Sequence, residues 1–442
     1  MTEHATFEDM TQDILREKIH RIVREGVCSG CGLCEAIAGP DRITVETVAV
    51  TGYGRPVVKG PLTHEIVDRI YDVCPATRWD GLPDRLVEAD TEIDGTWGPV
   101  RSMSLAHAAD PEVRYKAATG GVLTALSMFL VDSGEVDFVL HASAAASDPS
   151  YGDPLISKDA ASVRRGSGSV YAPTAPLRLA EEALSRGRPF AFVGKPCDIA
   201  PLRNLARFDP RVDELVKYWL APVCGGWTPP TTIDDFLANY GVHRSELTFF
   251  THRGDGCPGR VEFTTHDGRQ FDAHMYEAFG GLEEANWQIP FRCKLCPGGT
   301  AEACDIAAGD QWEDAKPDPV FELTDPGTNA VIVRTAAGAD LYRRAVEAGY
   351  INIEDEITPR WYDTRQPHQV NKKRVMRARW DALAAEGRLV ARSQGLRLES
   401  ESAKLSEEMR IEEYEGTRKR LRAGAADEPD PVPGSSSPLP AA

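Results

Sequence analysis

The ten cysteines of this 442-residue chain are the residues whose types and spacing most clearly indicate chemistry. Cys28, Cys31 and Cys34 form a C-x2-C-x2-C run, and Cys74 lies about forty residues further on, directly before a proline. The two-residue spacers let consecutive cysteines wrap around one cluster, and the glycines between them let backbone amides approach the sulfurs. A cubane 4Fe–4S cluster needs four thiolates, one for each iron. We therefore predict a 4Fe–4S cluster on Cys28, Cys31, Cys34 and Cys74.

A structural zinc site and a group of unligated thiols are the alternatives for this N-terminal cysteine set. Zinc usually takes two separated C-x2-C pairs rather than three evenly spaced cysteines. Clustered cysteines in a reducing compartment, where disulfides are disfavoured, point to metal or redox chemistry. The spacing therefore favours an iron–sulfur cluster.

Two further cysteines each follow a predicted strand. Cys197 follows a short buried strand over 189–193, and Cys224 follows a second strand over 215–223. A helix of about ten residues joins these strands, so we expect a βαβ unit with parallel neighbouring strands. Both thiols would then lie at the carboxyl edge of the sheet, where ligands collect in such folds.

The last four cysteines lie between residues 257 and 304. Cys293 and Cys296 form a C-x2-C pair, and we predict that they complete a second 4Fe–4S cluster with Cys197 and Cys224. Cys257 and Cys304 remain without an assigned role, because a buried apolar cysteine is as good an interpretation for each of them as a ligand.

Two glycine-containing segments could hold the phosphates of a cofactor. Thr119, Gly120 and Gly121 open an apolar helix, where unpaired backbone amides and the helix dipole favour an anion. The loop over 164–169 supplies two arginines and a flexible turn that could hold a pyrophosphate, although a plain surface turn is the alternative. No G-x-G-x-x-G in a βαβ context, Walker A loop or G-x-S-x-G elbow is present, so a Rossmann nicotinamide site is not supported.

Alternating strands and helices from about residue 100 predict an α/β fold, α+β overall, to position these residues. Local patterns predict several elements in the N-terminal part of the chain. These are a helix over 8–25, a loop over 28–39 whose shape a bound metal dictates, a hairpin over 41–60 and a polar linker over 80–98. We expect four regions: a small ferredoxin-like cluster domain over 1–98, a larger α/β domain over 99–365, a helical extension over 366–422 and a disordered tail over 423–442.

Composition excludes several classes of function. The net charge of −18 makes a nucleic-acid partner a poor expectation, since such proteins usually show a basic excess or a basic face. No apolar run approaches the length of a membrane span, and the acidic, polar start does not resemble a signal peptide. We therefore expect a cytoplasmic protein without a membrane span.

The chain resembles a known family at several motifs that occur in one order, namely VCSGCGLC, RYKAATGGVLTAL, RRGSGSVYAP, FVGKPCDIAPLRNL, PVCGGWTP, HRGDGCPGR and FRCKLCPGGTAEACDIAAGDQW. Together they are similar to the coenzyme F420 hydrogenase/dehydrogenase beta-subunit family, which includes 7-hydroxymethyl chlorophyll a reductase. The resemblance spans about residues 26–355. It departs from the family at Cys74, which usually follows the run closely, and after Cys296, where the family is usually rich in aspartate.

The resemblance implies FAD on the 99–365 domain, beside two 4Fe–4S clusters. The cofactor-binding residues that it and the residue patterns together indicate are Arg114, Thr119, Gly120, Gly121, Gly168, Ser169, Tyr171, Lys195, Gly309 and Asp310. The same motifs carry the second cluster onto Cys197, Cys224, Cys293 and Cys296.

We therefore predict an oxidoreductase in which FAD links one-electron clusters, served by ferredoxin or another redox protein, to a small-molecule two-electron substrate. One alternative is the electron-transfer beta subunit of a larger hydrogenase or dehydrogenase complex, with partner subunits, that reduces or oxidises coenzyme F420. A zinc-stabilised binding protein is the weaker alternative. His107, Lys195 and Asp198 are the candidate acids or bases near the flavin, and no residue identifies the substrate.

Overall fold

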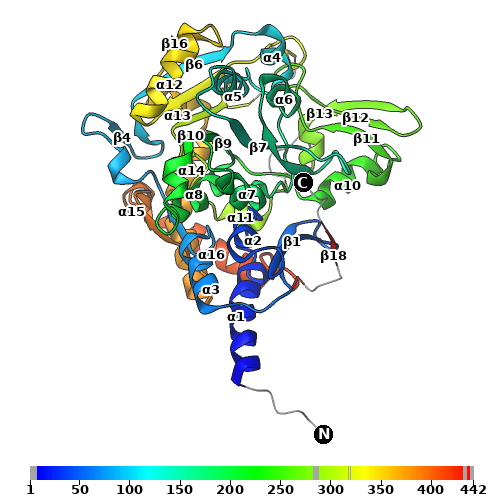
Figure 1. Cartoon of the computed structure of the whole chain (residues 1–442), viewed down its shortest axis with the longest axis vertical. Coiled ribbons are helices and arrows are strands. Elements are labelled where there is room, and N and C mark those ends of the chain that lie inside the picture. Colours follow the sequence, from blue (N-terminus) through cyan, green and yellow to red (C-terminus); the bar gives the residue numbers. More distant parts are fainter. Residues whose placement is uncertain (1–6, 282–287, 317, 319, 432–435, 439–442) are drawn as a thin grey trace.

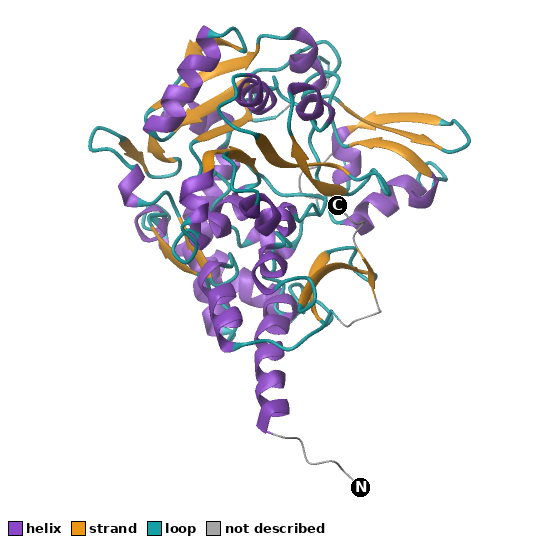
Figure 2. Cartoon of the chain, viewed as in Figure 1, coloured by secondary structure: helices purple, strands orange, loops and turns teal. Residues whose placement is uncertain are grey.

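A computed structural model describes residues 7–281, 288–316, 318, 320–431 and 436–438 of the chain. An eight-stranded mixed sheet lies at its centre (Figures 1 and 2). In order across the sheet, the strands are β16 (Ile351–Glu356), β6 (Ser102–Ala108), β15 (Asn329–Val333), β14 (Ile306–Asp310), β10 (Val216–Pro222), β9 (Phe190–Val193), β7 (Phe138–Ala144) and β8 (Gly152–Ser157). The four strands from β14 to β7 run parallel, and the outer pairs are antiparallel. The predicted α/β fold is confirmed.

Helices cover both faces of this sheet because its strands are apolar on both sides. In β9, Phe190 and Phe192 face one hydrophobic cluster, whereas Ala191 between them faces the other. One face is covered by α5 (Val122–Asp132), α6 (Ala160–Arg165) and α12 (Ala336–Glu347), and the other by α7 (Ala180–Ser185) and α8 (Pro196–Leu205). The predicted unit of two parallel strands joined by a helix is therefore β9-α8-β10.

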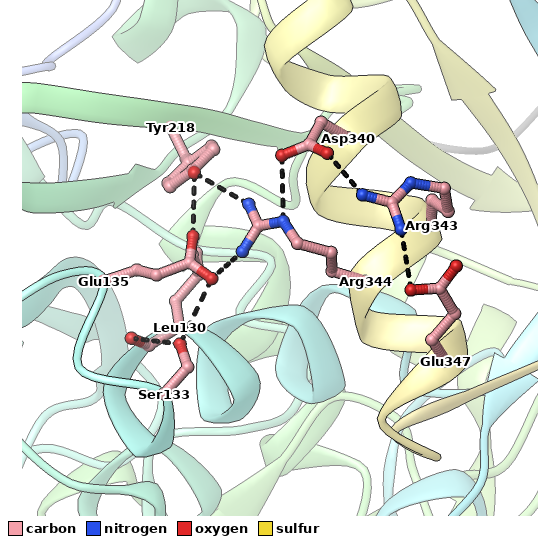
Figure 3. Close-up of polar contacts among 8 residues, drawn as sticks. All are labelled: Leu130, Ser133, Glu135, Tyr218, Asp340, Arg343, Arg344 and Glu347. Atoms are coloured by element: carbon pink, nitrogen blue, oxygen red, sulfur yellow. Dashed lines mark hydrogen bonds and ion pairs between the residues drawn. The ribbon is translucent and has the colours of Figure 1, made fainter.

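A polar network fixes α12 against the end of α5 and against β10 (Figure 3). Arg344 pairs with Glu135, which follows α5, and donates to the hydroxyl of Tyr218 on β10 at 3.2 Å. Tyr218 in turn donates to Glu135 at 2.8 Å, and Asp340 accepts from Arg344 at 2.8 Å. The network joins three elements that are far apart in the sequence.

The N-terminal segment and the C-terminal extension form one layer below the sheet, where blue and orange to red segments intermix in Figure 1. The N-terminal part contains α1 (Phe7–Arg24), α2 (Leu33–Ala38), β1 (Ile43–Val48), β2 (Gly54–Val58), α3 (His64–Val73) and β3 (Arg78–Asp80). The C-terminal part contains α13 (Pro359–Arg365), α14 (Pro367–Ala385), β17 (Arg392–Gln394), α15 (Leu398–Ser402) and α16 (Glu407–Arg422). β17 pairs in parallel with β3, so the two ends of the chain share a small sheet.

A third unit projects beside the sheet and consists of α10 (Pro230–Ala238) with the antiparallel strands β11 (Leu247–Thr251), β12 (Arg260–Thr265) and β13 (Gln270–His274). A turn at 266–268 joins β12 to β13, and an irregular loop over 252–259 separates β11 from β12. This loop returns to the main sheet, where its residue Arg253 contacts Asp310 of β14 in the wall of the cavity described below.

Two predicted irregular segments contain secondary structure. The expected loop over 28–39 includes α2, and the expected linker over 80–98 runs into a hairpin of β4 (Glu92–Asp94) and β5 (Gly98–Val100). Trp97 explains the second difference, because it is fully buried and its ring stacks on Tyr362 with 4.3 Å between centroids. The helix over 8–25 and the hairpin over 41–60 are confirmed as α1 and β1–β2.

The predicted disordered tail over 423–442 also differs from the structure where it is described. Ala426 is buried, and Glu428 pairs with the buried Arg55. The short strand β18 (Ser436–Pro438) pairs with β1, whereas 432–435 and 439–442 lie outside the described residues. A composition rich in proline, serine and alanine predicts no core of its own, but it cannot reveal a partner elsewhere in the chain. No helix among the described residues is long and apolar enough to cross a membrane.

Candidate functional site

The four cysteines of the N-terminal set line one small cavity. Cys28, Cys31 and Cys34 come from the loop before α2 and from its first turn, and Cys74 caps the C-terminal end of α3. The remaining lining is apolar side chains and glycine or serine, and it includes Pro201 of α8. The structure therefore brings together all four predicted thiols, and no histidine or carboxylate joins them in this lining.

Burial dominates the electrostatics of this N-terminal set. It raises the pKa of each thiol, to about 12 for Cys74, because a thiolate is poorly solvated there. Repulsion between neighbouring thiolates raises the pKa of Cys31, Cys34 and Cys74 further. Backbone N–H groups of Gly30, Leu33 and Ala76 donate to the sulfurs of Cys28, Cys31 and Cys74, respectively. The set fits a ligand that supplies positive charge to buried sulfurs, as a metal cluster does.

The spacing of the thiols bears on the choice between zinc and a cluster. Among the described residues, no three His, Cys, Asp or Glu side chains come close enough to hold a single metal ion. Zinc needs four ligands around one point, with sulfurs about 2.3 Å from the metal. A cubane distributes its thiolates over four irons and needs a wider ring of sulfurs. The preference for a cluster over zinc therefore stays a prediction from the spacing of the cysteines in the sequence.

The second cysteine set lies around the N-terminal end of α8. Cys197 is in the first turn of α8, Cys224 follows β10, and Cys293 and Cys296 lie in and after the short helix α11 (Phe291–Lys294). Each of Cys197, Cys224 and Cys293 has its pKa raised, first by burial and also by the charges of other members of the set. The four predicted thiols are therefore neighbours, as the parallel arrangement of β9 and β10 predicts.

A cavity of about 880 Å³ opens at the carboxyl ends of the parallel strands. Its lining includes Lys195 after β9, Cys224 after β10 and Asp310 at the end of β14, together with Cys293. This volume lies in the range of known small-molecule sites, and the position at the carboxyl edge is where open α/β sheets bind ligands.

Most of the predicted cofactor-binding residues line this cavity, namely Thr119, Gly121, Gly168, Ser169, Tyr171, Lys195, Gly309 and Asp310. Gly121 has a φ of +75°, and a Cβ there would lie 2.9 Å from the carbonyl oxygen of Val113. Glycine is therefore required at the start of α5, where the amide of Val122 donates to Oδ1 of Asn329 at 3.1 Å and where Leu123 and Thr124 also line the cavity.

Three predicted residues lie outside the lining of the large cavity. Arg114 donates to the carbonyl oxygen of Gly327 at 2.7 Å and to Glu354 at 3.0 Å, and Gly120 packs against the backbone of 327–329. Nδ1 of His107 on β6 lies 2.8 Å from the carbonyl oxygen of Ala108, and Nε2 lies 3.4 Å from Oε1 of Glu354. The contacts of Arg114 and His107 are structural. Asp198, by contrast, lines the cavity with Lys195.

Lys195 and Asp198 form a buried ion pair in the wall of the large cavity. The Nζ of Lys195 lies 2.9 Å from Oδ2 of Asp198 and donates to Thr174 at 2.6 Å. Burial is the largest single effect on Lys195 and disfavours its charged form, but Asp198, Cys197 and Cys224 together outweigh it, so the pKa of Lys195 is raised. Because an ammonium has three N–H donors, one remains for a ligand. Oδ1 of Asp198 is buried without a hydrogen-bond partner among the described residues.

Arg253 organises the cavity, and sequence reasoning missed it. This residue of the 252–259 loop is 2% exposed. Its guanidinium donates to Asp310 at 3.0 Å, to the hydroxyl of Tyr171 at 3.2 Å and to Thr119 at 3.2 Å. It thus connects three predicted cofactor residues that come from separate segments. The HRGDGCPGR motif carries it, but that motif singles out the cysteine rather than the arginine.

The C-terminal extension supplies a wall of the cavity that the sequence did not indicate. Gln366, His368, Gln369 and Lys372 of the α14 region line the cavity, as do Arg379 and residues of α16. Gln369 donates to the carbonyl oxygen of Cys224 at 3.0 Å, so α14 is fixed directly against the second cysteine set. Burial lowers the pKa of Lys294 in this wall, and Arg420 and Arg379 lower it further.

Cys257 and Cys304 line neither cavity. Cys304 is fully buried in the core of the main sheet, where its thiol donates to the carbonyl oxygen of Ala301 at 3.0 Å. Cys257 is buried beside Arg253, and burial raises the pKa of this thiol to about 12. Both are therefore buried cysteines that lie apart from the two predicted cluster sets.

Comparisons with known proteins place the chain among related sequences. Two family profiles, for the N-terminal and the C-terminal part of the "Coenzyme F420 hydrogenase/dehydrogenase, beta subunit", match residues 103–180 and 187–358, together more than half of the chain. The F420-dependent formate dehydrogenase 1 subunit beta of Methanococcus maripaludis is 26% identical over 284 residues, covering 60% of this chain and 70% of the relative. The coenzyme F420 hydrogenase subunit beta of Methanothermobacter thermautotrophicus is 22% identical, covering 59% of this chain and 88% of the relative.

Among solved structures, a chain of the F420-reducing nickel–iron hydrogenase complex from Methanosarcina barkeri is 18% identical, with a TM-score of 0.47 over 64% of this chain and 95% of that chain. The profile matches include β9, α8, β10 and β14, the elements that border the large cavity. The ordered motifs and the two profiles lead to one conclusion: the chain belongs to the coenzyme F420 hydrogenase/dehydrogenase beta-subunit family.

Proposed function

We propose that this protein is an iron–sulfur flavoprotein oxidoreductase that moves electrons between two 4Fe–4S clusters and a small-molecule substrate through FAD. The observation that carries the proposal is the composition of the large cavity. One part of its wall contains the glycine-rich start of α5 and the loop with Gly168 and Ser169, and another contains Cys224 and Cys293. A bound flavin would exchange single electrons with clusters and electron pairs with a substrate.

The chain's own residues prepare the cavity for an anionic cofactor. The first turn of α5, at Leu123 and Thr124, and the loop over 166–170 both line the cavity, and a helix N-terminus suits a pyrophosphate. Lys195, held by Asp198 and Thr174, keeps a fixed positive charge at the wall. A fixed cation beside a redox group favours its reduced, more negative form. Arg253 holds Thr119, Tyr171 and Asp310 in place, so that these side chains are oriented before a ligand enters.

The test is the cofactor content of anaerobically purified protein. We expect flavin absorption, a broad iron–sulfur absorption that dithionite bleaches, and about eight iron atoms per chain. Protein that carries zinc in place of iron, or that contains neither iron nor flavin after anaerobic purification, would refute the proposal.

A second candidate function is that of an F420-linked beta subunit within a larger complex. It is supported by the relatives, two of which are named as beta subunits of F420-dependent enzymes. Gel filtration of protein from its native source, followed by an anaerobic assay with coenzyme F420, discriminates the two. A homo-oligomer that reduces its substrate with ferredoxin alone would rule out the complex.

A further inference from the structure

The C-terminal tail, residues 423–431, lies against the loop that carries the N-terminal cysteine set. Gly26, two residues before the first cysteine of that set, contacts the backbone of Ala426 so closely that a Cβ at Gly26 would overlap it. Arg55, which pairs with this tail, lies against Gly30 of the same loop, where a Cβ would be 3.3 Å from the guanidinium. The tail therefore covers a surface directly beside the proposed N-terminal cluster.

Three arginines from separate segments each pair with one carboxylate of the tail. We call them the tail-binding arginines: Arg24 at the end of α1, Arg55 on β2 and Arg388 after α14. Their partners, in the same order, are Asp430 at 3.0 Å, Glu428 at 2.6 Å and Asp427 at 2.7 Å. Among the described residues, Arg24 also pairs with Glu17, whereas the tail supplies the only carboxylates within 4.0 Å of Arg55 and Arg388. Opening of the tail would therefore leave two cations without a counter-ion.

Charge, more than apolar packing, holds the tail in place. Residues 423–431 consist of alanine, glycine, proline and acidic residues, without a large apolar side chain. Ala426 and Pro431 are buried, but side chains of this size bury little apolar area. A segment with few apolar contacts opens at a low cost in free energy. The tail can therefore exchange with another acidic group that reaches the same arginines.

The whole chain has a net charge of −18, so an acidic partner needs a local group of cations in order to dock. We propose that the tail-binding arginines are the docking site of an acidic one-electron carrier protein, and that residues 423–431 occupy this site until the carrier displaces them. In the docked pair, one electron passes between the carrier and the adjacent cluster, so that one is oxidised as the other is reduced. The inference rests on the proposed function in assigning a cluster to the adjacent cysteines.

The experiment is calorimetric titration of the anaerobically purified full-length protein with an acidic ferredoxin as the probe. Glu428→Gln weakens the docking of the tail, so this variant should bind the probe more than about tenfold more tightly than wild type. Asp430→Asn removes only an exposed pair and should change the affinity by less than about fivefold. With the tail released by Glu428→Gln, a second change of Arg388→Gln should weaken binding about tenfold. The matched control is Arg343→Gln in the same background, because Arg343 is exposed on α12 and pairs only locally; it should leave the affinity unchanged.

A second measurement needs no variant. Binding of ferredoxin to the wild-type protein should accelerate amide hydrogen exchange at 424–430, because the displaced tail loses its contacts. The inference is overturned if ferredoxin binds without this acceleration, or if Glu428→Gln binds it no more tightly than wild type. Iron and flavin are measured separately on the same samples, and docking is read as heat rather than as turnover. Failure of the proposed function is therefore distinguishable from failure of the docking site.

Discussion

Replacing Glu428 with glutamine would leave a buried guanidinium without its counter-ion beside the N-terminal cysteine set. Arg55 and Glu428 form a two-point pair, with distances of 2.6 and 2.8 Å between guanidinium nitrogens and carboxylate oxygens. Their side chains are only 1% and 10% exposed. Arg55 also lowers the pKa of Cys28 against the stronger effect of burial, so the pair lies next to the proposed cluster.

The expected cost follows from this burial. Removing one partner of a buried ion pair costs about 3–5 kcal/mol, because the remaining charge stays desolvated. This loss of stability first affects the equilibrium between the docked and the open 423–431 segment, because the tail can open without unfolding of the sheet. A loss of about 3 kcal/mol corresponds to about a hundredfold change in an opening equilibrium. We therefore expect amide hydrogen exchange at 424–430 to accelerate about a hundredfold in Glu428→Gln.

The matched control is Asp430→Asn in the same tail. Asp430 pairs with Arg24 at 3.0 Å, but both side chains are more than a third exposed. Exposed pairs contribute about 0–1 kcal/mol, so exchange in this variant should change by less than about fivefold. Hydrogen exchange with mass spectrometry on the anaerobic protein measures both variants. Equal exchange in Glu428→Gln and wild type would show that the pair does not hold the tail.

Three further predictions concern the site. Cys31→Ser and Cys224→Ser should each lower the iron content of anaerobically purified protein by about four atoms per chain, whereas Cys304→Ser, in the core, should not change it. Arg253→Met should lower the FAD retained on gel filtration, because Asp310 and Tyr171 lose their shared donor. The control is Arg260→Met, since Arg260 lies outside the cavity lining. Equal retention of FAD in the two variants would contradict the role of Arg253. Burial lowers the pKa of His141 to about 4, so the unfolded chain binds a proton that the folded chain does not as the pH falls below about 6.5. The free energy of unfolding should therefore fall by about 2 kcal/mol through His141 between pH 7 and pH 5, and denaturant titrations should show a shallower pH dependence in His141→Asn.

The positions of Cys197 and Cys224 could be predicted because the signals that fix them are local. A short apolar run, a proline in the first turn of α8 and a second apolar run determine β9-α8-β10 without reference to distant segments. Parallel strands then bring both thiols to one edge of the sheet. Gly121 was predictable for a similar reason, since the start of an apolar helix is visible in the sequence.

Arg253 and the wall from α14 could not be predicted, because their roles depend on contacts between distant segments. Nothing within 252–259 indicates that this loop returns to Thr119 and Asp310. The α14 sequence has only a weak amphipathic pattern, so its charged residues suggest a solvated helix rather than a cavity wall. The pairing of Arg55 with Glu428 joins residues 373 positions apart and is equally invisible to local patterns.

Helix α8 links the two cysteine sets and the large cavity into one arrangement. Cys197 in its first turn belongs to the second set, and Pro201 lines the cavity of the N-terminal set. Four residues of α-helix rise about 6 Å, so Cys197 and Pro201 are about one helical turn apart. Asp198 lies between Cys197 and Pro201 along α8. Its negative charge raises the pKa of Cys31, and its carboxylate pairs with Lys195 in the wall of the large cavity. Because α8 is almost entirely buried, its register cannot shift at one site without shifting at the others. The order of N-terminal set, second set and cavity is therefore built into the packing of a single helix, which is the geometry that the proposed electron transfer requires.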